Sequence, residues 1–131
     1  MRFLLDTCAV LYCSFNTDDL SGVARTELTT ASQGEVVVSA VSIAEIACLV
    51  ERGRLTLQRH WRLWWDEILH QTGWACLPIT PVVMAEAHSL PPPIHRDSGD
   101  RILIATARIE RLTLATTDRK ILGYPPVQSL A

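Results

Sequence analysis

Short apolar segments alternate with helix-forming segments along the whole chain, and this alternation limits the possible folds more than any other feature. The candidate strands are 2–5, 36–38, 74–79 and 112–116, with a further edge strand in the tail 125–130. Helical patterns cover 7–15, 21–33, 42–52, 55–73, 81–90 and 99–111, and a helical turn follows at 118–122. Such alternation is typical of a parallel sheet with helices on both faces. We therefore expect an α/β/α sandwich with a central, mainly parallel sheet.

Length and composition favour one domain spanning residues 1–131, since 131 residues with 48% hydrophobic side chains suffice for one core. The net charge of −2 does not by itself indicate a nucleic-acid partner. No secretory signal is evident, and no apolar run approaches the roughly 20 residues of a membrane-spanning helix. The four cysteines lack the spacing of a zinc site. We expect a cytoplasmic protein with reduced thiols and no membrane association.

Four acidic residues stand where a strand ends or a helix begins. Asp6 follows the strand FLL, Asp118 follows LAT, Asp100 heads the apolar run RILIATA, and Glu45 lies one turn into the helix after VVV. Each acid taken alone could be a helix cap, because carboxylates stabilise helix N-termini. The spacing from Ser42 to Glu45 is that of a capping box.

The four positions together favour a shared site. The carboxyl ends of parallel strands meet at one edge of the sheet, where ligands bind near the point at which strand order reverses. Four carboxylates crowded there would repel one another unless a divalent cation were present. Oxygen ligands of this kind suit Mg²⁺ or Mn²⁺. The sequence therefore predicts a metal site built from the four acids.

The segments FLLDT, SAVSIAEIA, DSGDRILIATA and LATTD, in this order and spacing, resemble the signature of the PIN-domain ribonucleases. The small size and the tail YPPVQSL resemble in particular the VapC toxins of toxin–antitoxin pairs. The resemblance covers nearly the whole chain and implies an α/β/α sandwich and a Mg²⁺- or Mn²⁺-dependent endoribonuclease. Two departures are Ser98-Gly99, where many relatives have a proline and an aromatic residue, and Cys8.

The resemblance also implies roles for particular residues. The metal-binding and catalytic acids carry over to Asp6, Glu45, Asp100 and Asp118, and the supporting positions are Asp97, Thr116, Thr117 and Ser42. The reaction it implies is hydrolysis of RNA phosphodiester bonds by metal-activated water, with one or two ions left open.

Basic and apolar residues provide further candidates. His95, Arg96, Arg101, Arg119 and Lys120 flank the last two acids and could contact RNA phosphates, although exposed charges are usually only solvated. VapC-like proteins pair with a small, VapB-like antitoxin and commonly form homodimers. Because Trp61, Trp64 and Ile68 fit one buried helical stripe with Leu57, we expect the off-stripe Leu63 and Trp65 to contact the antitoxin or a second subunit.

Three other functions remain possible on the sequence alone. A PIN-like domain without activity could act as a binding scaffold, although all four acids are present. A nuclease acting on DNA is excluded by nothing in the sequence. An aspartyl-phosphate phosphatase is disfavoured, because the first strand is followed by Asp6-Thr7-Cys8 and lacks the second aspartate of an Asp-x-Asp pair.

Overall fold

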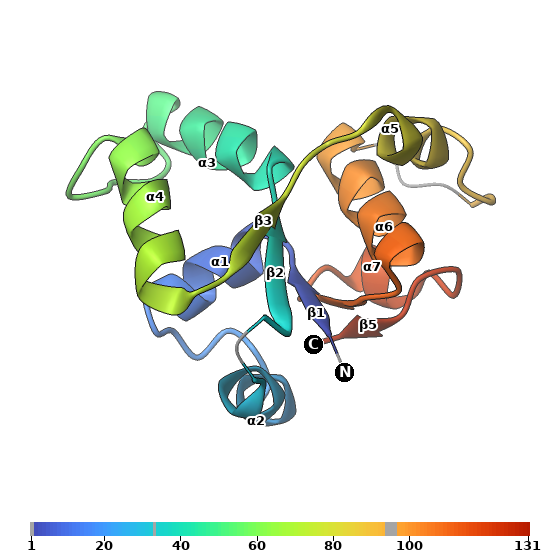
Figure 1. Ribbon diagram of the computed structural model, residues 1–131, viewed down its shortest axis with the longest axis horizontal. Coiled ribbons are helices and arrows are strands. Elements are labelled where there is room, and N and C mark those ends of the chain that lie inside the picture. The colour runs from blue at the N-terminus through green and yellow to red at the C-terminus, as the bar shows by residue number, and fades with distance from the viewer. Residues whose placement is uncertain (1, 33, 94–96) are drawn as a thin grey trace.

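The computed structural model describes residues 2–32, 34–93 and 97–131 and shows a parallel sheet covered by helices on both faces (Figure 1). Within these residues the sheet has five strands in the order β3-β2-β1-β4-β5, and every pairing is parallel. The strands are β1 Phe3–Leu5, β2 Val36–Ser39, β3 Ala75–Leu77, β4 Thr113–Ala115 and β5 Ser129–Leu130. The expected sandwich is confirmed, and the tail forms the expected edge strand.

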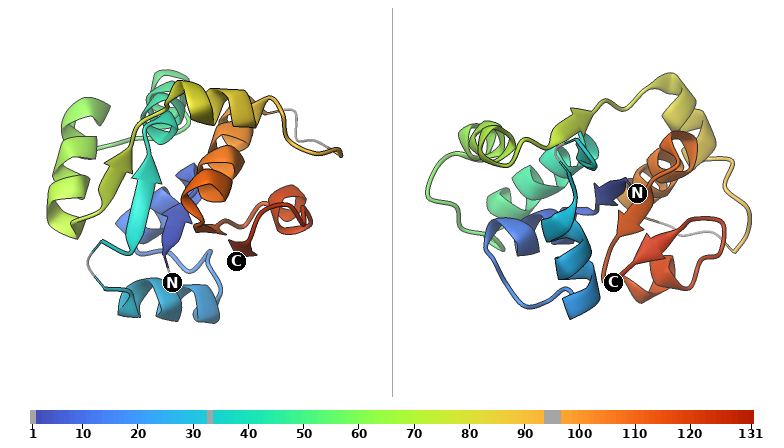
Figure 2. Two further views of the ribbon diagram at one scale, coloured as in Figure 1. Left: turned by 45° about the vertical axis from the view of Figure 1, so that its right-hand side comes forward. Right: turned by 60° about the horizontal axis from the view of Figure 1, so that its bottom comes forward.

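The helices divide between the two faces of the sheet (Figure 2). The first face carries α1 Thr7–Ser14, α2 Gly22–Thr30, α3 Val41–Glu51 and α4 Trp61–Thr72, and the second carries α5 Pro81–Ala87, α6 Ser98–Glu110 and α7 Arg119–Leu122. Successive side chains of a strand point to opposite faces. Phe3 and Leu5 accordingly pack in the first apolar core, and Leu4 in the second.

The helix expected over 55–73 is shorter than the sequence pattern indicated. It begins only at Trp61, because His60 has a non-helical backbone with ψ 139° and its Nδ1 accepts a hydrogen bond from the Arg62 amide at 3.2 Å. Leu57 still packs against the core, but from the preceding loop. At the other end, Gly73 adopts φ 76° and terminates the helix as expected.

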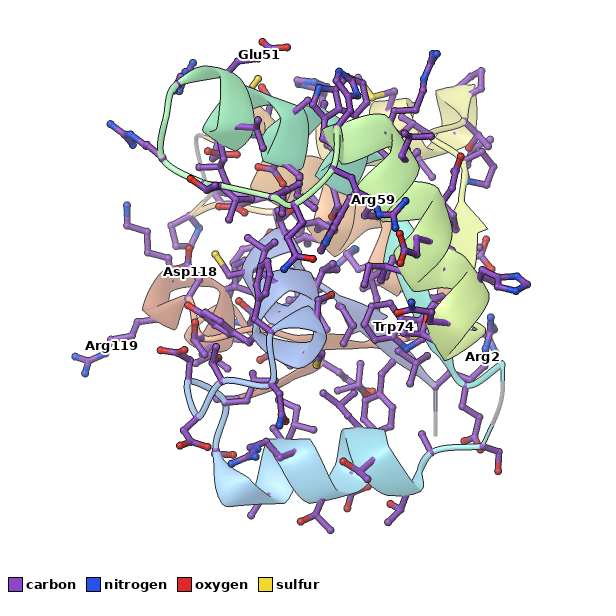
Figure 3. All side chains as sticks on the ribbon, turned by 90° about the vertical axis from the view of Figure 1, so that its left-hand side faces the viewer. Arg2, Glu51, Arg59, Trp74, Asp118 and Arg119 are labelled. Atoms are coloured by element: carbon purple, nitrogen blue, oxygen red, sulfur yellow. The ribbon has the colours of Figure 1, made fainter. Side chains whose placement is uncertain are left out.

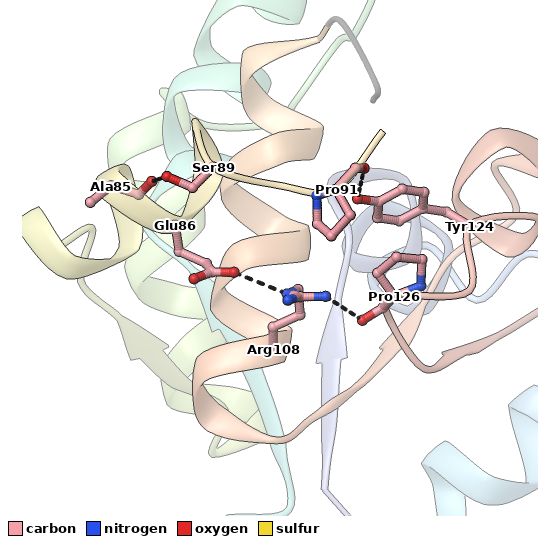
Figure 4. A network of polar contacts seen from close by, with 7 residues as sticks. All are labelled: Ala85, Glu86, Ser89, Pro91, Arg108, Tyr124 and Pro126. Atoms are coloured by element: carbon pink, nitrogen blue, oxygen red, sulfur yellow. Dashed lines mark hydrogen bonds and ion pairs between the residues drawn. The ribbon is translucent and has the colours of Figure 1, made fainter. Parts of the chain in front are cut away.

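Polar contacts around α6 connect the elements on the second face of the sheet (Figure 4). The Arg108 guanidinium donates to Glu86 of α5 at 3.1 Å and to the carbonyl of Pro126 at 2.8 Å. The Tyr124 hydroxyl donates to the carbonyl of Pro91 at 2.6 Å. The network ties the segment after α7 to the α5–α6 pair.

The topology gathers helix N-termini at one edge of the sheet. A helix that connects parallel strands runs antiparallel to them, so α1, α3 and α6 begin at the carboxyl edge. The chain leaves central β1 toward β2 on one side, whereas β4 lies on the other side of β1. Strand order therefore reverses between β1 and β4, where ligand crevices form in such sheets. None of the helices in the described ranges combines the length and apolar character needed to cross a bilayer.

Candidate active site

Asp6 occupies the carboxyl end of β1 and is only 6% exposed. One carboxylate oxygen accepts the Ala9 amide at 2.7 Å, and the other accepts the Thr116 hydroxyl at 2.5 Å. The same Thr116 oxygen accepts the Asp118 amide at 3.0 Å, so this fully buried hydroxyl links the ends of β1 and β4. Asp6 is thus both the N-cap of α1 and the most buried acid of the site.

Glu45 is not part of a capping box. Helix α3 begins after Ala40, which makes no side-chain cap, and Ser42 lies inside the helix with no exposed surface. The Thr7 hydroxyl donates to Glu45 Oε1 and lies 2.9 Å from the Ser42 hydroxyl. Because Thr7 has a single proton, Ser42 must donate to Thr7. The serine therefore supports Glu45 through Thr7, and the capping-box alternative is wrong.

Two aspartates lie at the start of α6. Asp97 caps the helix by accepting the Asp100 amide at 3.1 Å. Burial, followed in order of importance by the charges of Asp97, Asp118, Glu45 and Asp6, raises the pKa of Asp100 to about 7. The contacts of Thr116 join Asp6 to the Asp118 amide, and Glu45 and Asp97 both lie beside Gly99, so the structure brings these acids to the same edge of the sheet as Asp100.

The other buried acids respond in the same direction. Burial raises the pKa of Asp6, against the hydrogen bonds from Thr116 and Ala9, and Asp118 raises it further. Burial likewise raises the pKa of Glu45, where the Thr7 hydrogen bond opposes the charges of Asp97 and Asp6. Carboxylates packed in this way hold protons or attract a cation.

The donor set suits a hard divalent cation, because carboxylate oxygens are the preferred ligands of Mg²⁺ and Mn²⁺. Within residues 2–32, 34–93 and 97–131, however, no three or more Asp, Glu, His or Cys side chains are arranged so that together they could hold a metal ion. Mg²⁺ commonly retains several waters, so a site of this kind does not require direct contact from every acid.

The predicted supporting and basic residues differ in how exposed they are. Thr117 is half-buried and directly follows the buried Thr116. Arg119 and Lys120 are exposed at the start of α7, and Figure 3 shows the Arg119 side chain extending away from the body of the protein, next to Asp118. Arg101 is half-buried in α6. His95 and Arg96 lie outside the described residues.

The two interface candidates in α4 differ in exposure. Leu63 is 58% exposed and remains a candidate. Trp65 is 5% exposed and packs in the first core. The expectation that Trp65 projects outward is wrong, because α4 buries two adjacent tryptophans against the sheet rather than one stripe. All four cysteines are free thiols, and Cys8 and Cys48 are exposed.

Two residues that touch Glu45 were not singled out as site residues from the sequence. Thr7 supplies the hydrogen bond described above. A Cβ atom at Gly99 would lie 2.5 Å from Glu45 Oε2, so only glycine leaves the present space for this carboxylate. No local pattern signals either contact, because Thr7 and Glu45 are 38 positions apart in the chain.

Comparison with known proteins identifies the family and similar folds. The PIN domain family model matches residues 3–124. The chain is 31% identical over 121 residues to Ribonuclease VapC22 of Mycobacterium tuberculosis, covering 92% of this chain and 90% of that protein. Its fold is similar to that of VapBC2 from Rickettsia felis bound to a promoter DNA fragment, with a TM-score of 0.71, 14% identity, and coverage of 98% and 97%. FitAcB from Neisseria gonorrhoeae gives a TM-score of 0.65 at 22% identity, with coverage of 99% and 97%.

Proposed function

Because the chain belongs to the PIN-domain family, we propose that it is a metal-dependent endoribonuclease and the toxin of a VapBC-type toxin–antitoxin pair. The observation that supports the proposal is the position of the four acids at the carboxyl edge of the sheet, where Thr116 bonds to both Asp6 and the Asp118 amide and where the helices that carry Glu45 and Asp100 begin. The 31% identical relative is named a ribonuclease, which favours RNA over DNA as substrate. On this proposal, residues 1–131 act as one nuclease domain in the cytoplasm.

Asp6, Glu45 and Asp100 would hold the principal Mg²⁺ or Mn²⁺ ion, directly or through water, and Asp118 would complete the set. When bound, such an ion stabilises charge on a phosphoryl oxygen and lowers the pKa of a nucleophilic water. Thr116 would keep Asp6 oriented, and Ser42 would support Glu45 through Thr7. One carboxylate would accept the proton of the attacking water.

The basic residues beside the site would bind the substrate. Arg119 and Lys120 stand at the start of α7 directly after Asp118, and Arg101 directly follows Asp100. Guanidinium and ammonium groups are the usual partners of RNA phosphates. Arg101, Arg119 and Lys120 would therefore position the backbone of a single-stranded or looped RNA. Arg96 is included in this set on its sequence position alone.

A small antitoxin is the proposed protein partner. The similar solved structures include VapBC2 and FitAcB, named above, and a toxin–antitoxin complex from Klebsiella pneumoniae. The exposed Leu63 of α4 is the proposed contact residue, with the antitoxin or with a second copy of the chain in a homodimer.

The test compares wild-type protein with the Asp6→Asn variant. We expect Mn²⁺ to raise the melting temperature of the wild type, since a ligand of the folded state stabilises it, and to have little effect on the variant. The wild type should cleave RNA with added Mg²⁺ or Mn²⁺, and the variant should not, although its circular dichroism spectrum is unchanged. An equally active variant refutes the assignment. A silent scaffold would cleave neither nucleic acid, and a DNA nuclease would prefer DNA in the same assay.

A further inference from the structure

Two residues outside the predicted acid set enclose the Glu45 carboxylate from different elements. Thr7 belongs to the first turn of α1, and Gly99 to the first turn of α6, whereas Glu45 projects from α3. Thr7 touches Oε1 and Gly99 faces Oε2. We propose that Thr7 and Gly99 form a slot that fixes the position of the Glu45 carboxylate at the site, and we call this pair the Glu45 slot.

The Thr7 side of the slot is a directional contact. Thr7 is 7% exposed, so its hydroxyl must be satisfied within the protein, and its proton goes to Glu45. Ser42, which has no exposed surface, donates to the Thr7 oxygen and leaves the hydroxyl one direction in which to donate. A hydroxyl held in this way orients the carboxylate that it binds.

The Gly99 side of the slot is a matter of space. The Glu45 Oε2 and Cδ atoms lie 2.5 Å and 2.9 Å from the place where a Cβ of residue 99 would stand, and Asp97 Oδ1 lies 3.2 Å from it. Any other side chain at this position would have to move the carboxylate. Since the displaced group is the end of a flexible side chain, the backbone need not move with it.

The slot therefore gives Glu45 its position before any ion binds, which reduces the reorganisation that binding requires. This consequence rests on the proposed function, because it treats Glu45 as a metal-binding acid. The slot itself does not, since its contacts belong to the protein alone. Thr7 and Gly99 are positioning residues that act through Glu45.

The first experiment measures the slot in metal-free protein. Thr7→Val and Gly99→Ala are made in the wild type and in a Glu45→Ala background, and urea unfolding midpoints are compared as double-mutant cycles. We expect Thr7→Val to lower the midpoint less in the Glu45→Ala background, where no carboxylate is present. Gly99→Ala should raise the midpoint more in that background, because alanine favours the helix and no longer meets Glu45. Additive effects in both cycles overturn the slot.

The second experiment measures the Mn²⁺ dissociation constant and the rate of RNA cleavage. We expect Thr7→Val and Gly99→Ala to weaken Mn²⁺ binding roughly 10- to 100-fold, the usual effect of losing a residue that orients a ligand. Thr7→Ser keeps the hydroxyl and should restore most of the affinity. Gly99→Ala should weaken Mn²⁺ binding without lowering the urea midpoint of the metal-free protein. A purely structural role for Gly99 would not produce this combination.

Thr106→Val is the matched control, because Thr106 is also a buried threonine but its hydroxyl donates only within α6, to Ile102 at 2.7 Å. It should bind Mn²⁺ as the wild type does. Wild-type affinity in both Thr7→Val and Gly99→Ala overturns the slot as a device for metal binding. A wild-type protein that neither binds Mn²⁺ nor cleaves RNA overturns the proposed function instead, and the metal-free cycles then decide the slot.

Discussion

The two ends of α6 differ in their electrostatic surroundings. At the N-terminal end, Asp97 and Asp100 lie beside Glu45, and like charges raise the pKa of Asp100 on top of the effect of burial. At the C-terminal end, Arg108 is paired with Glu86 and bonded to the Pro126 carbonyl (Figure 4). Between them the helix is anchored by the buried residues Ile102, Leu103, Ile104, Ala105 and Ala107.

This difference teaches where stability and function reside. We call the N-terminal end of α6 the acidic end and its C-terminal end the paired end. Burial of the apolar middle of α6 supplies the free energy that holds the acidic end in place, although the charges there repel one another. Substitutions at the acidic end should therefore change activity without loss of stability. Substitutions at the paired end should change stability without loss of activity.

The largest expected effect is on activity, at the acidic end. Asp100→Asn keeps the shape of the side chain but removes its charge, and we expect RNA cleavage to fall roughly 100-fold or more. The metal-free melting temperature should stay level or rise, because the variant removes one of several like charges. Cleavage assays and thermal melts on the same preparations check both parts. Lower stability together with full activity would reverse the roles of the two ends.

The next effect is on stability, at the paired end. Arg108→Met removes the bonds to Glu86 and Pro126, and we expect a loss of about 1.5–3 kcal/mol in unfolding free energy, as for hydrogen bonds to charged groups. Cleavage per folded molecule should be unchanged.

The matched control is Arg59→Met, because Arg59 also pairs with a glutamate at 3.1 Å but the arginine is 62% exposed. A surface pair of this kind contributes at most about 1 kcal/mol. Equal losses in the two variants would show that the network around α6 contributes no more than a surface ion pair.

The pH dependence of stability tests the acidic end of α6 without an activity assay. A carboxyl whose pKa rises from 3.8 to about 7 on folding stabilises the folded state below its ordinary pKa, and this contribution is lost as pH rises through about 7. Metal-free protein should therefore lose about 1–2 kcal/mol between pH 4 and pH 7 relative to Asp100→Asn, after allowance for solvent screening. Urea unfolding across this range measures the difference, and saturating Mn²⁺ should abolish it. A difference of opposite sign would mean that Asp100 is held ionised.

The smallest effect concerns the Tyr124 hydroxyl. Tyr124→Phe removes only the hydrogen bond to the Pro91 carbonyl, and we expect a loss of roughly 0.5–1 kcal/mol with no change in RNA cleavage. Urea unfolding and a cleavage assay check the two parts. A clear fall in activity would show that the paired end also supports the acidic end.

Much of the fold could be predicted because it depends on local patterns. The β-branched run 36–38 predicts a strand, and the apolar run after Asp100 predicts a helix. Both predictions depend only on residues close together in the chain. The helix boundaries were predicted less accurately. Apolar and polar residues alternate over 55–60 with helical spacing, yet α4 begins only after these residues, because His60 is its N-cap. Trp65 was misplaced because periodicity indicates one buried stripe and does not show how far the sheet extends beneath a helix.

The candidate site divides in the same way. The sequence by itself determined that acids stand at strand ends and helix starts, because both depend on near neighbours along the chain. Only the tertiary structure decided that Ser42 is buried behind Thr7 and that Gly99 leaves room for Glu45. These contacts join α1, α3 and α6, and which helices meet follows from the strand order β3-β2-β1-β4-β5 and the packing of long-range partners, which no local pattern encodes.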